Sequence, residues 1–162
     1  MALEIERKFL LANNGWQPQV RKSYRIVQAY LSRSPERTVR VRVRDDEAFL
    51  TIKISAPISA SAGDAPTSNE FEYNIPLQDA EELLKLCLSG TIHKTRNEVL
   101  HAGHLWEIDV FHGDNEGLIV AEIELADAAE QFTKPDWVGD DVTADKRYSN
   151  AHLSKAPYKD WD

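Results

Sequence analysis

The residues of this chain that could do chemistry are charged side chains that recur at a spacing of two. Basic residues in such alternating stretches are Lys8, Arg40, Arg42, Lys53, Lys94 and Arg96. Acidic residues in such stretches are Glu4, Glu6, Glu70, Glu72, Glu107, Asp109, Glu122 and Glu124. Arginine grips phosphate oxygens through its planar fork, and clustered carboxylates hold hard divalent cations such as Mg²⁺ or Mn²⁺. Together the two sets indicate a site for a metal-bound polyphosphate.

The elements that must position these side chains are predicted to be β-strands. Successive residues of a strand point to opposite faces, so the charged residues of each motif share one face and apolar residues occupy the other. In "TVRVRVR" (38–44), for example, three valines oppose three arginines. A single strand of this kind would equally suit the solvent face of an ordinary sheet. When several strands each carry charges of one sign on one face, these charges repel one another and destabilise the sheet unless a ligand of opposite charge binds them. The charged strands taken together therefore favour a binding site.

The alternating stretches predict a closed barrel. They lie at 3–10, 23–32, 38–44, 49–55, 70–75, 91–100, 105–111 and 118–125. Closing eight antiparallel strands would turn the charged faces toward a common wet interior and the apolar faces outward, where helices can partly cover them. The predicted fold class is therefore mainly β (α+β): a closed eight-stranded antiparallel barrel, or tunnel, with a few flanking helices in one domain, 1–162.

The remaining segments are predicted to be helices and one long loop. Helical spacing of apolar residues predicts helices at 78–89, 126–132 and 145–155. The stretch 55–69, "SAPISASAGDAPTSN", is small, polar and interrupted by Pro and Gly, so it is predicted to be a mobile loop. The single cysteine, Cys87, excludes an internal disulfide framework and is expected to be a core thiol.

Composition excludes several classes of protein. The chain is 42% hydrophobic and 28% charged, as globular proteins are, and its net charge is −8. Residues 1–55 hold eleven Lys and Arg against six Asp and Glu, whereas the rest holds eight against twenty-one. This balance does not suit a nucleic-acid binder, and no apolar run has membrane-spanning length. The acidic start is unlike a signal peptide, so we expect a cytoplasmic protein, and the lack of a Walker loop excludes a P-loop site.

The ordered motifs resemble the CYTH superfamily, the triphosphate tunnel metalloenzymes. In chain order they are Glu4-x-Glu6-x-Lys8, Arg40-x-Arg42, Lys53, Glu70-x-Glu72, Lys94-x-Arg96, Glu107-x-Asp109 and Glu122-x-Glu124. The tail "VTADKRYSN" (142–150) is similar to that of the short bacterial members that act on inorganic triphosphate. The resemblance implies an eight-stranded tunnel that hydrolyses or cyclises a triphosphate with Mg²⁺ or Mn²⁺. The Ser/Ala-rich stretch 55–69 departs from the pattern and puts the shape of one tunnel entrance in doubt.

The resemblance also implies roles for individual residues. The metal ligands would be Glu4, Glu6, Glu122 and Glu124, with Glu107 and Asp109 extending the cluster or holding a second metal. The phosphate-gripping residues would be Lys8, Arg40, Arg42, Lys53 and Arg96. Lys94, with Lys53 as its neighbour, is the candidate general base, because a lysine crowded by other cations has its neutral form favoured. The alternative, in which Lys94 is one more phosphate clamp, stays open.

Three classes of function follow. The first is hydrolysis of inorganic tripolyphosphate to pyrophosphate and phosphate. The second is an organic-triphosphate enzyme of the same fold, a CYTH-type adenylyl cyclase or a thiamine triphosphatase, which should show an aromatic or apolar patch at one tunnel mouth. The third is a non-catalytic polyphosphate- or nucleotide-binding module. In each case we expect a small-molecule triphosphate as partner, no nucleic acid or membrane, and a monomer or homodimer.

Overall fold

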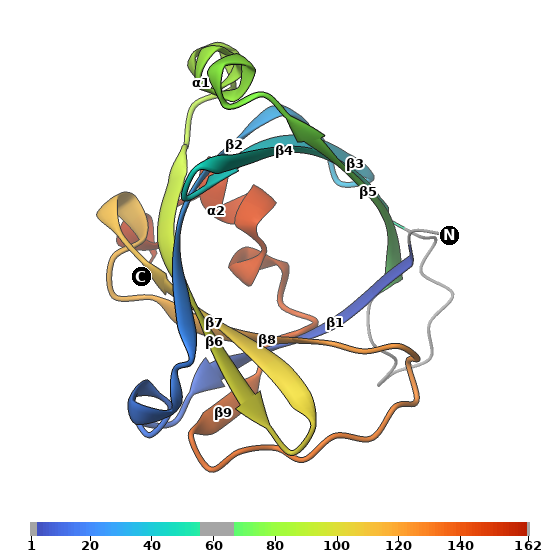
Figure 1. The fold of residues 1–162 in the computed structure, drawn as a ribbon, viewed down its shortest axis with the longest axis vertical. Coiled ribbons are helices and arrows are strands. Elements are labelled where there is room, and N and C mark those ends of the chain that lie inside the picture. The colour runs from blue at the N-terminus through green and yellow to red at the C-terminus, as the bar shows by residue number, and fades with distance from the viewer. Residues whose placement is uncertain (1–2, 56–66, 162) are drawn as a thin grey trace.

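The computed structural model describes residues 3–55 and 67–161, which form a closed antiparallel β-barrel (Figure 1). Its strands are β1 (Leu3–Leu11), β2 (Lys22–Arg33), β3 (Arg37–Arg44), β4 (Glu47–Ser55), β5 (Thr67–Ile75), β6 (Ile92–His101), β7 (His104–Phe111), β8 (Ile119–Glu124) and β9 (Val138–Asp141). Neighbouring strands follow the order β5-β4-β3-β2-β6-β7-β8-β1-β9. Pairing of β5 with β1 closes the ring, so the prediction of an eight-stranded barrel is confirmed.

The strand β9 was not predicted, and it completes one edge of β1. β1 pairs along one edge with β8. Along the other edge, the residues around Glu4 pair with β5, whereas Phe9 and Leu11 pair with β9. β9 therefore satisfies the backbone groups that β5 leaves uncovered at the end of β1. Its sequence, "VGDD", is too short and has no alternation by which to recognise a strand.

The predicted helices are confirmed in part. α1 spans Leu77–Leu86, and α2 spans Asn150–Lys155. The expected helix at 145–155 is divided by Ser149, which is extended and whose hydroxyl accepts a hydrogen bond from the His152 amide as the N-cap of α2. Short 3-10 turns lie at Gln17–Gln19, Gly113–Asn115, Lys146–Tyr148 and Tyr158–Asp160. In the described ranges no helix is long and apolar enough to span a bilayer.

The predicted helix at 126–132 is wrong. These residues form bends and a turn, in which the carboxylate of Glu130 accepts a hydrogen bond from the Ala126 amide. The segment instead places Phe132 edge-on against Phe9 and Trp106 on the outside of the barrel. Tertiary packing of this one aromatic residue outweighs the weak helical pattern. The predicted loop at 55–69 lies mostly outside the described residues, and β5 begins at Thr67, earlier than expected.

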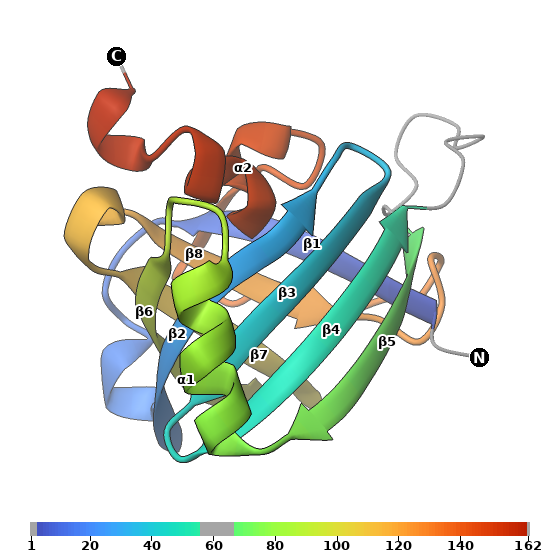
Figure 2. The same ribbon diagram turned by 90° about the horizontal axis from the view of Figure 1, so that it is seen from above.

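The main hydrophobic core lies outside the barrel, on the outward faces of its strands. Ile5, Ile108 and Ile123 belong to it, together with Trp16 and Trp137 from the covering loops. α1 covers a second patch on the outer faces of β2, β3 and β4, where Ala80 packs near Val41 (Figure 2). Cys87 is half-buried at that patch rather than fully buried as expected. Because the apolar faces are covered from outside, the charged faces are left to line the interior.

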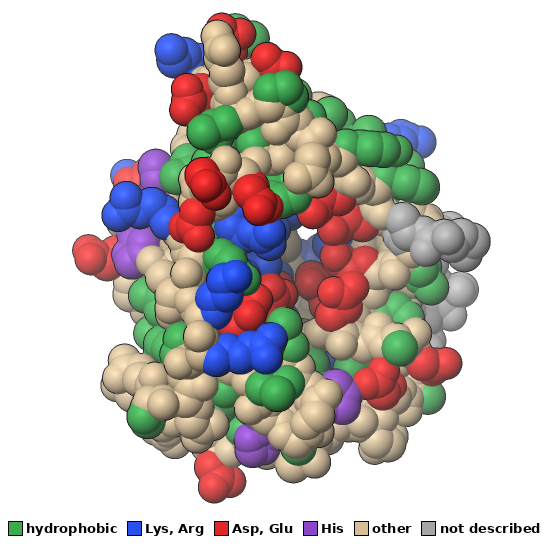
Figure 3. All heavy atoms as spheres, viewed as in Figure 1, with side chains coloured by type: hydrophobic (Ala, Val, Ile, Leu, Met, Phe, Trp, Pro, Cys, Tyr) green, Lys and Arg blue, Asp and Glu red, His purple; other side chains and the backbone are tan. Residues whose placement is uncertain are grey.

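The C-terminal segment closes one end of the barrel. α2 is seen behind the ring of strands in Figure 1 and at one end of the barrel in Figure 2. Leu153 of α2 packs with Ile92, Phe111 and Val120 from β6, β7 and β8. The opposite end is the one seen open in Figure 3. We call this open end the tunnel mouth.

Trp106 is the residue whose loss is expected to destabilise the outer core most. It is fully buried on β7, and its ring lies 5.6 to 5.8 Å, centroid to centroid, from Phe9, Phe132 and Trp137. Trp106→Ala should lower the free energy of unfolding by about 3–5 kcal/mol, measured by urea denaturation. Leu100→Ala, at a 56% exposed position on β6, is the control and should change it by less than about 0.5 kcal/mol.

Candidate active site

Antiparallel pairing brings the predicted site residues into one tunnel. β1 and β8 set Glu6 opposite Glu124 and Lys8 opposite Glu122. β6 and β7 set Arg96 opposite Asp109. Viewed along the barrel, the centre of the molecule is hollowed and lined by basic and acidic side chains (Figure 3). The charged motifs, far apart in sequence, therefore form one continuous site.

Asp109 is the most enclosed acid of the tunnel. Its Oδ1 accepts a hydrogen bond from Arg96 Nε at 2.8 Å, and its Oδ2 accepts from Arg96 Nη2 at 2.9 Å and from Lys94 Nζ at 2.7 Å. Burial alone would raise the pKa of Asp109, but Arg96 and Lys94 outweigh it and hold this pKa well below its usual value. Both carboxylate oxygens of Asp109 thus already accept hydrogen bonds from Arg96 and Lys94. These bonds fix the orientation of the two cations.

Glu122 is likewise held between cations. Its carboxylate lies 3.5 Å from Lys8 Nζ and 3.5 Å from Arg96 Nη2. Burial opposes ionisation, but Lys8 and Arg96 outweigh it and lower the pKa of Glu122 to about 2. Arg96 also lies 3.4 Å from Glu107, so this one guanidinium contacts three acids. Arg96 is therefore the centre of the paired part of the site.

Glu4, Glu6 and Glu124 form a second group, which we call the acidic cluster. Burial raises the pKa of all three; Glu70 raises that of Glu4 further, and Glu122 that of Glu6. Such raised values mark carboxylates with too few cations around them. The ammonium of Lys53 lies 2.7 Å from Glu4 Oε1 and 3.8 Å from Glu6 Oε1, and Lys8 also lowers the pKa of Glu6.

The donor chemistry of the acidic cluster fits a hard divalent cation, which prefers several carboxylate oxygens. In the geometry seen here, no three His, Cys, Asp or Glu side chains of the described ranges converge closely enough to bind a metal. The ammonium of Lys53 contacts both Glu4 and Glu6 in this geometry. The pKa of Glu107 is also raised, by burial first and by Glu122, so Glu107 resembles the acidic cluster more than it resembles Asp109.

Lys94 is a buried lysine with an unusual environment. Its Nζ donates to Asp109 and, at 2.9 Å, to Oδ1 of Asn150. Burial, together with Arg96 and Arg42, lowers the pKa of Lys94 to about 7 despite Asp109. A neutral amine keeps both hydrogen bonds, because it has two N–H groups, and still has a free lone pair. Lys94 can therefore be a neutral amine, and so a base, near neutral pH.

The remaining predicted cations lie on the β3 side of the tunnel. Arg42 Nε donates to Gln28 Oε1 at 2.8 Å, and burial, Arg40 and Arg96 lower its pKa to about 9. Arg40 Nη2 forms an ion pair with Glu72 at 4.0 Å. Tyr30 is buried and lies in register with Arg40.

Two polar residues of the site were missed in the sequence. Gln28 is fully buried, and its Nε2 donates to Asn150 Oδ1 at 3.2 Å. Gln28 lies two positions before Tyr30, so the alternation of that strand was a usable signal for it. Asn150 begins α2 and reaches Lys94 only because the C-terminal segment folds back onto the barrel. No local pattern marks it.

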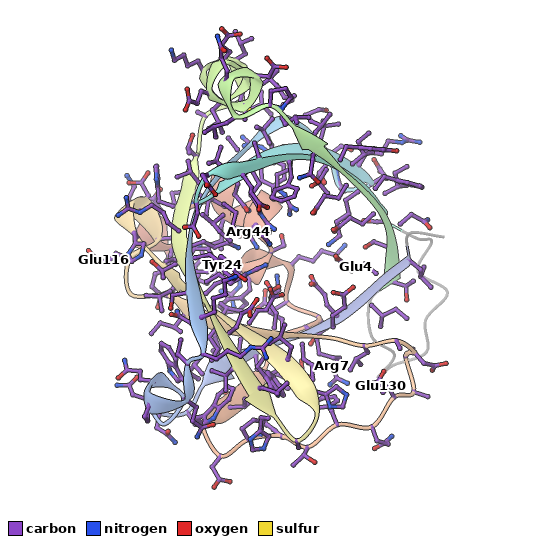
Figure 4. All side chains as sticks on the ribbon, in the orientation of Figure 1. Glu4, Arg7, Tyr24, Arg44, Glu116 and Glu130 are labelled. Atoms are coloured by element: carbon purple, nitrogen blue, oxygen red, sulfur yellow. The ribbon has the colours of Figure 1, made fainter. Side chains whose placement is uncertain are left out.

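An aromatic pair, also not recognised in the sequence, lies near the tunnel mouth. The guanidinium carbon of Arg44 lies 5.0 Å from the ring centroid of Tyr24 and 5.0 Å from that of Phe49. Figure 4 places Tyr24 and Arg44 inside the outline of the barrel, across from Glu4. The mouth thus has an aromatic surface, although Arg44 already covers part of it.

This chain is similar to known proteins both in sequence and in structure. The family model described as CYTH domain matches residues 2–157. A protein of Acetivibrio thermocellus named inorganic triphosphatase is 41% identical over 162 residues, covering 99% of each chain. One of the same name from Nitrosomonas europaea is 34% identical over 156 residues, covering 93% of this chain and 96% of that protein. The crystal structure of the inorganic triphosphatase NE1496 is 32% identical, covers 95% of each chain and has a TM-score of 0.64. The chain belongs to the CYTH domain family.

Proposed function

We propose that this protein hydrolyses inorganic tripolyphosphate to pyrophosphate and phosphate inside the tunnel, with a divalent metal. The observation that carries the proposal is the division of the tunnel into an acidic cluster and a set of buried cations around Arg96 and Arg42. A metal-bound triphosphate has the charges to complement both. The names of the two relatives, inorganic triphosphatase, support the same reaction.

The acidic cluster, Glu4, Glu6 and Glu124, would hold Mg²⁺ or Mn²⁺, with Glu107 and Glu122 close enough in register to extend it. When bound, the metal would neutralise phosphate charge and lower the pKa of a bound water. We assign Asp109 a different role, orienting Arg96 and Lys94, because both of its oxygens are already occupied. Phosphoryl transfer requires mainly such positioning and charge neutralisation.

The phosphate oxygens would be gripped by the cations of the tunnel. These are Lys8, Arg40, Arg42, Lys53, Lys94 and Arg96. Arg96 and Lys94 are held in place by Asp109, and Arg42 by Gln28, so their orientation is set before a ligand binds. Preorganised charges of this kind stabilise a transition state without reorganising at the moment of reaction.

Lys94 is our candidate for the general base, and the pH dependence of turnover tests it. A base must be neutral, so kcat for tripolyphosphate should rise as pH increases toward about 7 and level off above it. Lys94→Arg keeps the charge but offers no accessible base, so kcat should fall by about a hundredfold or more. Near-normal turnover by this variant would leave Lys94 only the role of a phosphate clamp.

A second candidate function is hydrolysis or cyclisation of an organic triphosphate. Tyr24 and Phe49 near the tunnel mouth favour it, because an aromatic surface there could contact a base or a thiamine ring. The phosphate-binding interior would be the same in both cases.

The deciding experiment is product release by the purified protein from tripolyphosphate, ATP and thiamine triphosphate, each with Mg²⁺ and with Mn²⁺. We expect fast phosphate release from tripolyphosphate, with equal amounts of pyrophosphate, abolished by a chelator. Cyclic AMP from ATP would identify a cyclase instead. Binding of a triphosphate without turnover would make the protein a binding module. A cytoplasmic location and a monomeric or homodimeric state stay predictions from the sequence.

A further inference from the structure

Lys53 occupies the position in the tunnel where the metal ligands and the phosphate-binding cations meet. Its Nζ donates to Glu4 Oε1 at 2.7 Å and lies 3.8 Å from Glu6 Oε1. In the described part of the chain, these are the ion pairs that Glu4 and Glu6 form. Lys53 therefore pairs with two of the three members of the acidic cluster, and Lys8 also lowers the pKa of Glu6.

The ammonium of Lys53 and a divalent cation repel each other when both lie at the carboxylates of Glu4 and Glu6, so they compete for this position. Lys53 donates to Glu4, one of the carboxylates that a metal bound by the acidic cluster would use. We propose that Lys53 is a built-in counter-ion of the metal site, which a divalent cation must displace to bind. The displaced ammonium would then be free to contact the triphosphate. This inference rests on the proposed function, because it assumes that the acidic cluster binds the metal.

Lys53 is more exposed than Lys94 and is held by fewer hydrogen bonds. The side chain of Lys94 is 0% exposed and is held by both Asp109 and Asn150. The side chain of Lys53 is 33% exposed, and Glu4 is the partner to which it donates a hydrogen bond. Its four-carbon stem carries a compact charge that can rotate away from the cluster when a metal takes over the pairing of Glu4.

The position of Lys53 in the barrel favours the same role. It lies on β4 in register with Glu70 of β5, and β5 pairs with the part of β1 that carries Glu4. Lys53 therefore reaches Glu4 across the seam that closes the barrel, from the wall that also carries Thr51, the hydrogen-bond partner of Arg40. An ammonium leaving the cluster remains beside the phosphate-binding cations.

The test is the affinity for Mn²⁺ in the absence of phosphate, measured by calorimetry at neutral pH. Lys53→Met removes the competing charge, so Mn²⁺ should bind about tenfold tighter than to wild type. Lys53→Arg keeps the charge and can grip carboxylates with two N–H groups, so Mn²⁺ should bind several-fold more weakly. Lys22→Met removes another positive charge near the mouth, one that contacts the Tyr24 ring at 4.8 Å, and should leave the affinity within about twofold of wild type.

The outcomes separate this inference from the proposed function. Equal Mn²⁺ affinity of wild type and Lys53→Met, with wild type binding the metal, would overturn the counter-ion role alone. Equal tightening by Lys53→Met and Lys22→Met would also overturn it, because the effect would then be one of overall charge. Failure of wild type to bind Mn²⁺, or full affinity in Glu4→Gln/Glu6→Gln, would overturn the metal site itself. Lys53→Gln provides a second neutral variant if Lys53→Met does not give a cooperative thermal transition.

Discussion

Replacing Glu4 and Glu6 together by glutamine is expected to lower kcat for tripolyphosphate by about a thousandfold or more. The two carboxylates belong to the acidic cluster, and glutamine has their shape without the charge that attracts a divalent cation. The measurement is phosphate release at saturating tripolyphosphate and Mn²⁺. The loss should not be restored by raising the metal concentration about tenfold, because the ligands themselves are gone.

The same double variant is expected to be at least as thermally stable as wild type. Burial and neighbouring acids raise the pKa of both residues, so their charged forms are unfavourable in the folded protein at neutral pH. Glutamine side chains carry no charge, so they remove the repulsion between the carboxylates and the cost of burying them. Lys53 loses its ion pairs with Glu4 and Glu6 in exchange. A stable variant that has lost turnover would confirm that the cluster is kept for function at a cost in stability. Near wild-type turnover in a folded variant would contradict the metal site.

Asp109→Asn is expected to have the largest effect on stability among the tunnel residues. Asp109 is fully buried between Arg96 and Lys94, so removing its charge leaves the buried Lys94 without its acidic partner and takes from Arg96 the nearest of its three acids. Breaking a buried pair in this way should lower the free energy of unfolding by about 3 kcal/mol or more, measured by urea denaturation at pH 7. Glu107→Gln, whose side chain is 30% exposed, is the matched control and should change it by less than about 1 kcal/mol.

Mn²⁺ binding by Asp109→Asn separates its two possible roles. If Asp109 orients Arg96 and Lys94, as its contacts indicate, the folded variant should bind Mn²⁺ with nearly wild-type affinity and hydrolyse tripolyphosphate slowly. If Asp109 were a metal ligand, affinity for Mn²⁺ would fall along with turnover. The second result would return Asp109 to the metal site that the resemblance to the CYTH superfamily implies.

Much of the barrel could be predicted because a strand determines which side chains share a face. Alternation in β3 placed Arg40 and Arg42 together and Val41 opposite them, and the structure has Val41 in the outer core. The same reasoning placed Glu4 and Glu6 on the tunnel side of β1, away from Ile5. These predictions needed only neighbours in the chain, for which the geometry of a strand is sufficient.

The two elements that the sequence did not predict correctly, the segment 126–132 and β9, depend on residues distant in the chain. The residues at 126–132 look weakly helical by themselves, but Phe132 is held by contacts with Phe9 and Trp106, which are distant in sequence. β9 exists because β1 offers it an unpaired edge. In both places a distant element, not the local pattern, decides the conformation.

By itself, the sequence determined the strands, their charged faces and therefore the chemistry of the tunnel, because all of these depend on local alternation. Only the tertiary structure decided how the charges are paired. In the folded barrel, Asp109 pairs with Arg96 and Lys94, and Lys53 pairs with Glu4 of the acidic cluster. Folding also brings Asn150 from the C-terminal segment to Lys94. Identical carboxylates acquired different roles because pairing and burial depend on which strands meet when the barrel closes.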